Sequence, residues 1–118
     1  MKQFLRDALS DFTYQTLRFR HSTQPRLRIL MYHRVTDAHP DDRLCVPVAR
    51  FDAQMRFLHG AGYRTITFAE AVRWVQQGGA LPDRAIVLTF DDGFEDNFLN
   101  AYPAMTRQGF TGIFFIPS

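Results

Sequence analysis

Residues 85–93 read AIVLTFDDG, an uncharged and mostly apolar run that ends in two carboxylates and a glycine. A strand that is apolar on both of its faces is typical of a parallel sheet with helices packed on both sides. The glycine after the acidic pair indicates a turn at the end of that strand. The stretch therefore predicts a buried strand whose carboxyl end presents Asp91 and Asp92.

Strand-like and helix-like segments alternate on both sides of this stretch. The other predicted strands are residues 27–32, 63–67 and 111–116. Apolar residues at helical spacing predict the helices between them, at Phe51, Met55 and Leu58, at Ala71, Val72 and Val75, and at Phe94, Phe98, Tyr102 and Met105. Thr67 and Glu70 form a capping-box pattern, and Pro103 is expected to kink or divide the last helix. The alternation predicts an α/β fold built on a parallel sheet.

The carboxyl ends of parallel strands meet at one edge of the sheet, which is where α/β folds place their sites. His33 directly follows the first predicted strand, which we expect to be buried, and Asp91 and Asp92 follow the third. The polar loop at residues 36–47 and the last residues, 117–118, are expected at the same edge. The sequence therefore predicts a site that contains both carboxylates and is lined by His33.

Two interpretations of the acidic pair stay open from the residues alone. In a functional site, one carboxylate binds a divalent metal while the other accepts a proton from water. In a structural role, Asp92 caps the following helix and Glu95 completes the capping pattern. A structural role is also open for His33, because a lone histidine is more often structural than catalytic.

The composition is that of an ordinary globular chain, with 46% hydrophobic and 22% charged residues among 118. The single cysteine, Cys45, excludes an internal disulfide. The sequence has neither the run of about 20 apolar residues that a membrane span needs nor a secretory signal. We therefore expect a chain that is cytoplasmic or peripheral to a membrane.

Residues 1–26 are predicted to be a separate unit, an amphipathic helix followed by a linker. Residues 1–34 carry seven Lys or Arg against two Asp, and apolar residues recur among the first of these charges at helical spacing. Such a helix packs against its own protein or lies on a membrane surface. A nucleic-acid partner is not expected, because the sequence has no run of basic residues and no binding motif.

A resemblance to a known family centres on TFDDG at residues 89–93. LMYHRV at residues 30–35 and Gly62-Tyr63 accompany it. Downstream matches are Asn97, Tyr102-Pro103, Gly109, Thr111, Phe114-Phe115 and Pro117. Over residues 27–118 the sequence resembles the N-terminal part of the polysaccharide deacetylase family, also called the NodB-homology or family-four carbohydrate esterases.

The resemblance implies the N-terminal portion, about four parallel strands, of a distorted (β/α)7 barrel. It implies metal-dependent removal of N-acetyl or O-acetyl groups from a polysaccharide or amino sugar. If the family motif applies, Asp91 is the general base and Asp92 is a ligand of a divalent metal, for which zinc is the first candidate. The family's further metal-binding motif, H-[ST]-x-x-H, does not occur in these 118 residues. We therefore expect an incomplete domain, inactive alone, that self-associates or needs a C-terminal portion.

Two other classes of function compete with an enzyme. A non-catalytic carbohydrate-binding or interaction remnant of a deacetylase domain fits the missing histidines. A phosphoacceptor receiver domain fits the length and the acidic pair, but it needs that pair after the first strand and a lysine late in the chain. The only lysine here is Lys2. The deacetylase is the leading hypothesis, and the remnant is its alternative.

Overall fold

The computed structural model describes residues 26–118, so the predicted helix and linker at residues 1–26 fall outside it except for Arg26. Membrane-surface contact through that helix therefore stays a prediction. In the part of the chain that is described, no helix is both long and apolar enough to cross a membrane. The elements in order are β1 (Arg28–Tyr32), β2 (Arg34–Val35), β3 (Cys45–Val46), α2 (Val48–Gly60), β4 (Arg64–Thr65), α3 (Phe68–Gln77), β5 (Ala85–Phe90), η1 (Asn97–Ala101), α4 (Tyr102–Arg107) and β6 (Ile113–Phe114).

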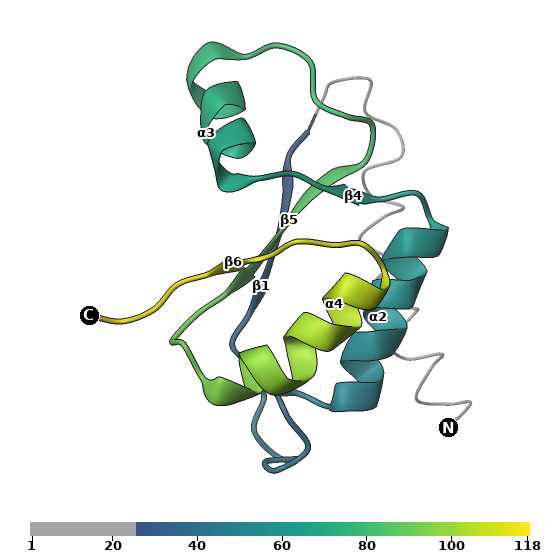
Figure 1. Ribbon diagram of the computed structural model, residues 1–118, viewed down its shortest axis with the longest axis vertical. Helices are drawn as coiled ribbons and strands as arrows, with labels where there is room; N and C mark the ends of the chain where they lie inside the picture. The colour runs from purple at the N-terminus through teal and green to yellow at the C-terminus, as the bar shows by residue number, and fades with distance from the viewer. Residues whose placement is uncertain (1–25) are drawn as a thin grey trace.

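The central sheet is parallel throughout, as the alternation of strands and helices predicts (Figure 1). β5 pairs with β1 along its length, with Leu88 opposite Leu30. On its other side, β5 pairs with β4 near its start and with β6 near its end, where Phe90 lies opposite Phe114. Every residue of β5 is buried, which confirms the prediction from residues 85–90.

One face of this sheet packs against α2 and α4. The core on this face contains Tyr32, Ile86, Leu88 and Phe90 from the sheet, Phe51, Met55 and Leu58 from α2, and Ala104 and Met105 from α4. Phe90 lies at its centre, with its ring 5.4 Å from the Tyr32 ring and 4.8 Å from the Phe114 ring, both in stacked geometry. Offset aromatic contacts of this kind add to the burial of apolar area, so this face is the main source of stability.

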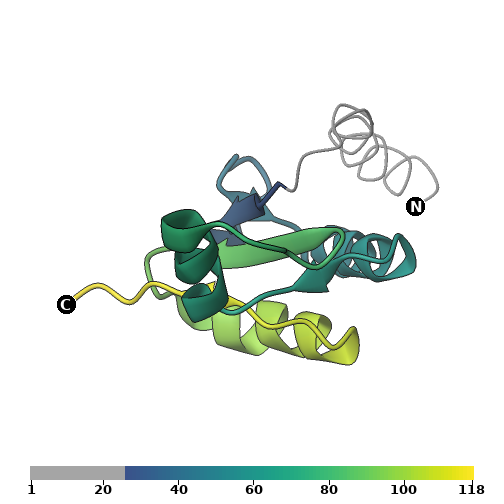
Figure 2. The ribbon, with the colours of Figure 1, turned by 90° about the horizontal axis from the view of Figure 1, so that it is seen from above.

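The opposite face of the sheet is covered only in part. α3 lies across β1 and β5 from α2 in both ribbon views (Figure 1, Figure 2). It packs with Val87 and Ala85 at one end of that face. Ile29 and Met31, which alternate outward from β1, remain 55% and 68% exposed. The prediction that β1 is a buried strand is therefore wrong for these two side chains, because residues 26–118 cover them only in part.

Local signals fix the helix boundaries. The capping box is present, with the Glu70 backbone N–H donating to Thr67 Oγ1 and the Thr67 N–H donating to the Glu70 carboxylate. Pro103 stands in the first turn of α4, directly after the π-helical η1, so the helix changes type next to the proline but is not divided, because Ala101 and Tyr102 keep helical backbone angles. Three further details differ from expectation. β4 and β6 are shorter than residues 63–67 and 111–116, and the loop at residues 36–47 contributes β3, which pairs with β2.

Candidate active site

The carboxyl ends of β1 and β5 bring His33, Asp91 and Asp92 together, as the sequence predicts. The last sheet bond at this point runs from the Asp91 N–H to the Tyr32 carbonyl, at 2.9 Å. Beyond it, His33 Nδ1 lies 3.1 Å from Asp92 Oδ2, and His33 Nε2 lies 3.8 Å from Asp91 Oδ2. The imidazole therefore lies between the two carboxylates and is closer to Asp92.

The short contact between His33 and Asp92 is a hydrogen bond whose donor and acceptor depend on the imidazole tautomer. With the Asp92 carboxylate as the acceptor, Nδ1 of His33 carries the proton of this bond. At 3.8 Å the Asp91 carboxylate is beyond hydrogen-bond distance from His33, and its lone pairs stay open to another donor. The His33 and Asp91 side chains are about one third exposed and Asp92 is 58% exposed, so a substrate or water reaches all three.

The turn after β5 separates the two carboxylates. Asp92 adopts a left-handed conformation, with φ of 73°, and Gly93 follows with φ of 63°. The helical residues that follow start at Glu95, and the Asp92 carboxylate bonds to His33. The structural alternative of Asp92 as a helix cap is therefore wrong. A Cβ at Gly93 would lie 3.2 Å from Cδ of Pro117, which shows that the chain end packs on this turn, as expected.

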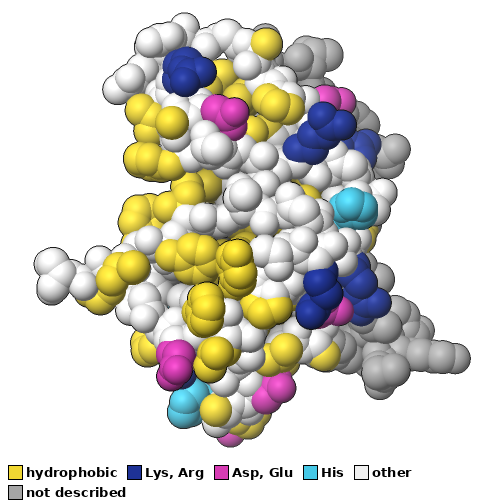
Figure 3. All heavy atoms as spheres, in the orientation of Figure 1, with side chains coloured by type: hydrophobic (Ala, Val, Ile, Leu, Met, Phe, Trp, Pro, Cys, Tyr) yellow, Lys and Arg dark blue, Asp and Glu magenta, His cyan; other side chains and the backbone are white. Residues whose placement is uncertain are grey.

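Asp91 faces the partly covered side of the sheet. A groove of about 440 Å³ runs along that side, with walls from β1, β5, β6 and α3. Its lining is apolar apart from Gln76, Thr89 and Asp91. The space-filling view shows apolar side chains gathered along the edge of the molecule that carries α3 and β6 (Figure 3). Asp91 therefore lies at the carboxyl end of an apolar groove.

Sequence reasoning missed two residues that support the site, Arg34 and Asp96. Arg34 Nε and Nη2 each lie 2.9 Å from Asp96 Oδ2, and Asp96 is the more buried partner. In the sequence, Asp96 looks like an ordinary acidic residue near the N-terminus of a helix, where a negative charge is favourable. A buried partner 62 positions away leaves no local signal.

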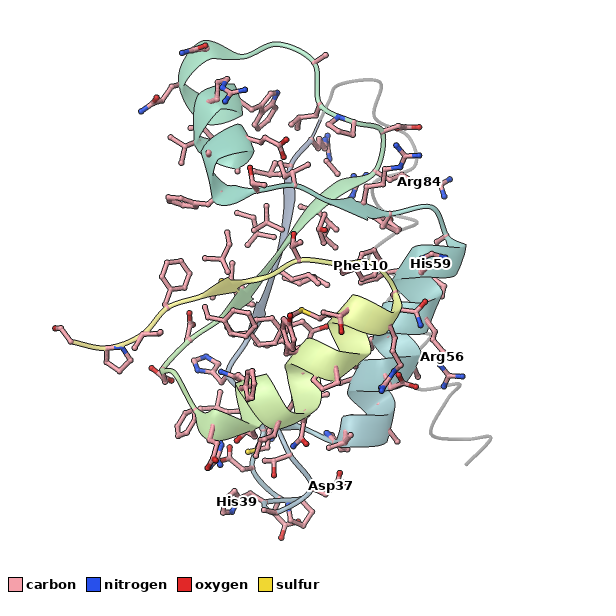
Figure 4. All side chains as sticks on the ribbon, viewed as in Figure 1. Asp37, His39, Arg56, His59, Arg84 and Phe110 are labelled. Carbon is pink, nitrogen blue, oxygen red and sulfur yellow. The ribbon has the colours of Figure 1, made fainter. Side chains whose placement is uncertain are left out.

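The polar loop at residues 36–47 leaves the carboxyl end of β1, as expected, and is held there by bonds from the Arg34 N–H to the Leu44 carbonyl and from the Thr36 N–H to the Val46 carbonyl. Neither of the other two histidines in the described part of the chain joins the cluster. His39 is in the loop between β2 and β3, and His59 stands beside Phe110 at the far end of α2 (Figure 4). His59 Nδ1 bonds the Gln108 carbonyl at 3.2 Å. Burial, and then Asp42, raise the pKa of the Cys45 thiol above its ordinary value, which argues against a reactive thiolate.

The described residues do not by themselves form a metal centre. Within residues 26–118, no three His, Cys, Asp or Glu side chains are grouped as ligands. His33 Nδ1 lies within hydrogen-bond distance of Asp92, and the tautomer that donates this bond leaves that nitrogen no lone pair for a metal. A catalytic zinc takes about three protein ligands. The described residues alone therefore do not fit a catalytic zinc.

Comparison with known proteins identifies the class. No family model matches the chain. YxkH of Bacillus subtilis (strain 168), whose name includes the term polysaccharide deacetylase, is 36% identical over 91 residues, 77% of this chain and 32% of YxkH. The poly-beta-1,6-N-acetyl-D-glucosamine N-deacetylase of Escherichia coli (strain K12) is 32% identical over 78 residues, 64% of this chain and 12% of that protein. The Streptococcus pyogenes deacetylase PplD in complex with acetate matches with a TM-score of 0.70 and 26% identity, over 80% of this chain and 43% of PplD.

The chain is thus a homologue of the polysaccharide deacetylases, and the resemblance predicted from residues 89–93 is confirmed. The parallel strands and helices form part of the same α/β barrel, which confirms the predicted fold class. The chain spans about a third of the length of YxkH and less of the E. coli protein. It therefore corresponds to one portion of such a protein.

Proposed function

We propose that this chain provides the water-activating part of a hydrolase that deacetylates an N-acetylated or O-acetylated polysaccharide. The carrying observation is the cluster of Asp91, Asp92 and His33 at the carboxyl end of β1 and β5. Its occurrence in a homologue of polysaccharide deacetylases supports this reaction over others that a carboxylate pair serves.

In this proposal Asp91 is the general base. Its carboxylate faces the groove and is beyond hydrogen-bond distance from His33, so it has lone pairs for an attacking water. A carboxylate in this position can accept a proton from that water as the water attacks the acetyl carbonyl. His33 lines the site and holds Asp92 in a separate orientation, which keeps the two carboxylates distinct.

We further propose that Asp92 is one ligand of a divalent metal, zinc in the first instance. Only Asp92 Oδ2 contacts His33, and the side chain is more than half exposed, which leaves Oδ1 accessible. The other ligands would have to come from outside residues 26–118. We therefore expect the isolated chain to hold zinc weakly and to release no appreciable acetate.

We also propose that the apolar groove is where the remainder of a deacetylase domain packs. Both faces of a parallel sheet are normally covered. Here Ile29, Met31 and Phe115 are each about half exposed or more. The matched segment is also less than half of PplD, so a homologous domain has more chain with which to cover this face.

A chimera tests the assignment. The matched residues of this chain replace their counterparts in the E. coli N-deacetylase, and acetate release from N-acetylglucosamine oligomers is measured with bound metal quantified in parallel. We expect Asp91→Asn to lower turnover by about 100-fold or more at full metal content, because it removes a base. Asp92→Asn should lose metal and turnover together, because it removes a ligand.

The matched control is Asp52→Asn, a carboxylate on α2 that pairs with Arg56 and Arg107 away from the site. It should leave both turnover and metal unchanged. If Asp91→Asn retained turnover, the base assignment would be wrong. A chimera that folds but releases no acetate where its parent does would favour the non-catalytic carbohydrate-binding remnant.

A further inference from the structure

The regular sheet does not determine how His33 meets Asp92. The ladder between β1 and β5 ends with the bond from the Asp91 N–H to the Tyr32 carbonyl. His33 and Asp92 both lie one residue beyond that bond. Asp92 also has a left-handed backbone, which turns the chain away from the strand direction. Another set of contacts must therefore hold the two side chains 3.1 Å apart.

Such a set lies directly beside the site. The Asp96 carboxylate accepts both Arg34 Nε and Arg34 Nη2 on Oδ2, each at 2.9 Å. Its Oδ1 accepts the Val35 backbone N–H at 3.0 Å. Asn100 Nδ2 donates to the Val35 carbonyl at 2.8 Å. We call Arg34, Val35, Asp96 and Asn100 the clamp.

The clamp joins the two segments that carry the site. Arg34 and Val35 follow His33, whereas Asp96 and Asn100 follow Asp92 at the start of the helix. The Asp96 side chain is only 10% exposed and the Arg34 side chain 27%. Charge-assisted bonds at two points of one carboxylate are stronger and more directional than neutral ones. The Arg34 guanidinium also lies 4.3 Å from the centre of the ring of Phe94, which stands between Asp92 and Asp96 in the chain.

We propose that Arg34, Asp96 and Asn100 are positioning residues that hold His33 against the carboxylate pair. They act through His33 and Asp92 and are not themselves within the groove. The catalytic meaning of this positioning rests on the proposed deacetylase function, whereas the positioning itself does not. The clamp therefore makes a prediction about the 118-residue chain without substrate or metal.

The test reads the protonated nitrogen of His33 by NMR in the full chain labelled with 15N-histidine. At about pH 9, where neutral imidazole tautomers are compared, the wild-type His33 should be the Nδ1–H form because Asp92 accepts that proton. Asp96→Asn keeps the size of the side chain but removes the charge that Arg34 binds. We expect it to lower the ratio of the Nδ1–H to the Nε2–H form at His33 by about tenfold. Asn100→Ala, which removes one neutral bond, should lower it by about threefold.

An internal reporter separates positioning from a general loss of structure. His59 Nδ1 bonds the Gln108 carbonyl at the far end of α2, so its tautomer should stay unchanged in both variants. Asp52→Asn removes a carboxylate that pairs with Arg56 and Arg107 away from the site, and it should leave His33 unchanged.

A His33 signal that does not move in either variant would overturn the proposal. So would His33 and His59 moving together in both variants, because the clamp would then stabilise the fold as a whole. Neither result depends on acetate release. Failure of the clamp is thus distinguishable from failure of the proposed function.

Discussion

Replacing Met31 by lysine should weaken self-association of the 118-residue chain. Met31 is 68% exposed on the partly covered face of the sheet, beside Ile29 at 55% and near Phe115 at 49%. Complete burial of such a side chain stabilises by about 1.5–3 kcal/mol, so burying the exposed half of each contributes about 1 kcal/mol. Three side chains on each of two copies then give about 6 kcal/mol.

This gain is similar to the cost of association, which is about 4–15 kcal/mol. At the lower end of that cost about 2 kcal/mol remains, so we expect only weak association, with a dissociation constant in the millimolar range. Met31→Lys removes about 1 kcal/mol from each copy, or 2 kcal/mol per dimer, which raises that constant by about 30-fold. Sedimentation velocity or size-exclusion chromatography with light scattering, over a series of concentrations, measures the change.

Phe98→Lys is the matched control. Phe98 is also 68% exposed, but it lies on η1 and stacks with Tyr102, away from the groove lining. It should leave the dissociation constant nearly unchanged. The reasoning is refuted if the wild-type chain is a monomer with a cooperative melt throughout, or if the two lysine variants weaken association equally.

Three further predictions concern stability and thiol chemistry. Phe90→Ala, at a fully buried position between stacked rings, should lower the free energy of unfolding by about 3–5 kcal/mol in urea titration, unlike an exposed control. Thr67→Ala breaks the capping box and should lower it by about 1 kcal/mol in the same assay, whereas no loss would show that the α3 terminus does not need its cap. Because the pKa of Cys45 is raised, its alkylation by iodoacetamide at about pH 8 should be slower than that of an unstructured thiol peptide. Asp42→Asn should speed that reaction, because it removes a charge that opposes the thiolate, and an unchanged rate would contradict this cause.

The sequence by itself predicted the elements that depend on local pattern. The apolar run at residues 85–90 forms the central strand, Thr67 caps α3, and Pro103 lies in the first turn of α4, where the helix changes type. It also predicted that His33 and the carboxylate pair meet, because parallel strands place their carboxyl ends at one edge. These inferences need only side-chain periodicity and a general rule of topology.

Only the tertiary structure decided which partners the side chains take. Asp92 pairs with His33, 59 positions away, rather than capping its own helix, because its left-handed backbone turns the carboxylate toward β1. Asp96 likewise pairs with a residue that is distant in the sequence, Arg34, 62 positions away. The exposure of Met31 was likewise hidden, because an apolar strand has the same sequence pattern whether or not another layer covers it. Local pattern determines which face of a strand is apolar, whereas distant segments determine what that face contacts.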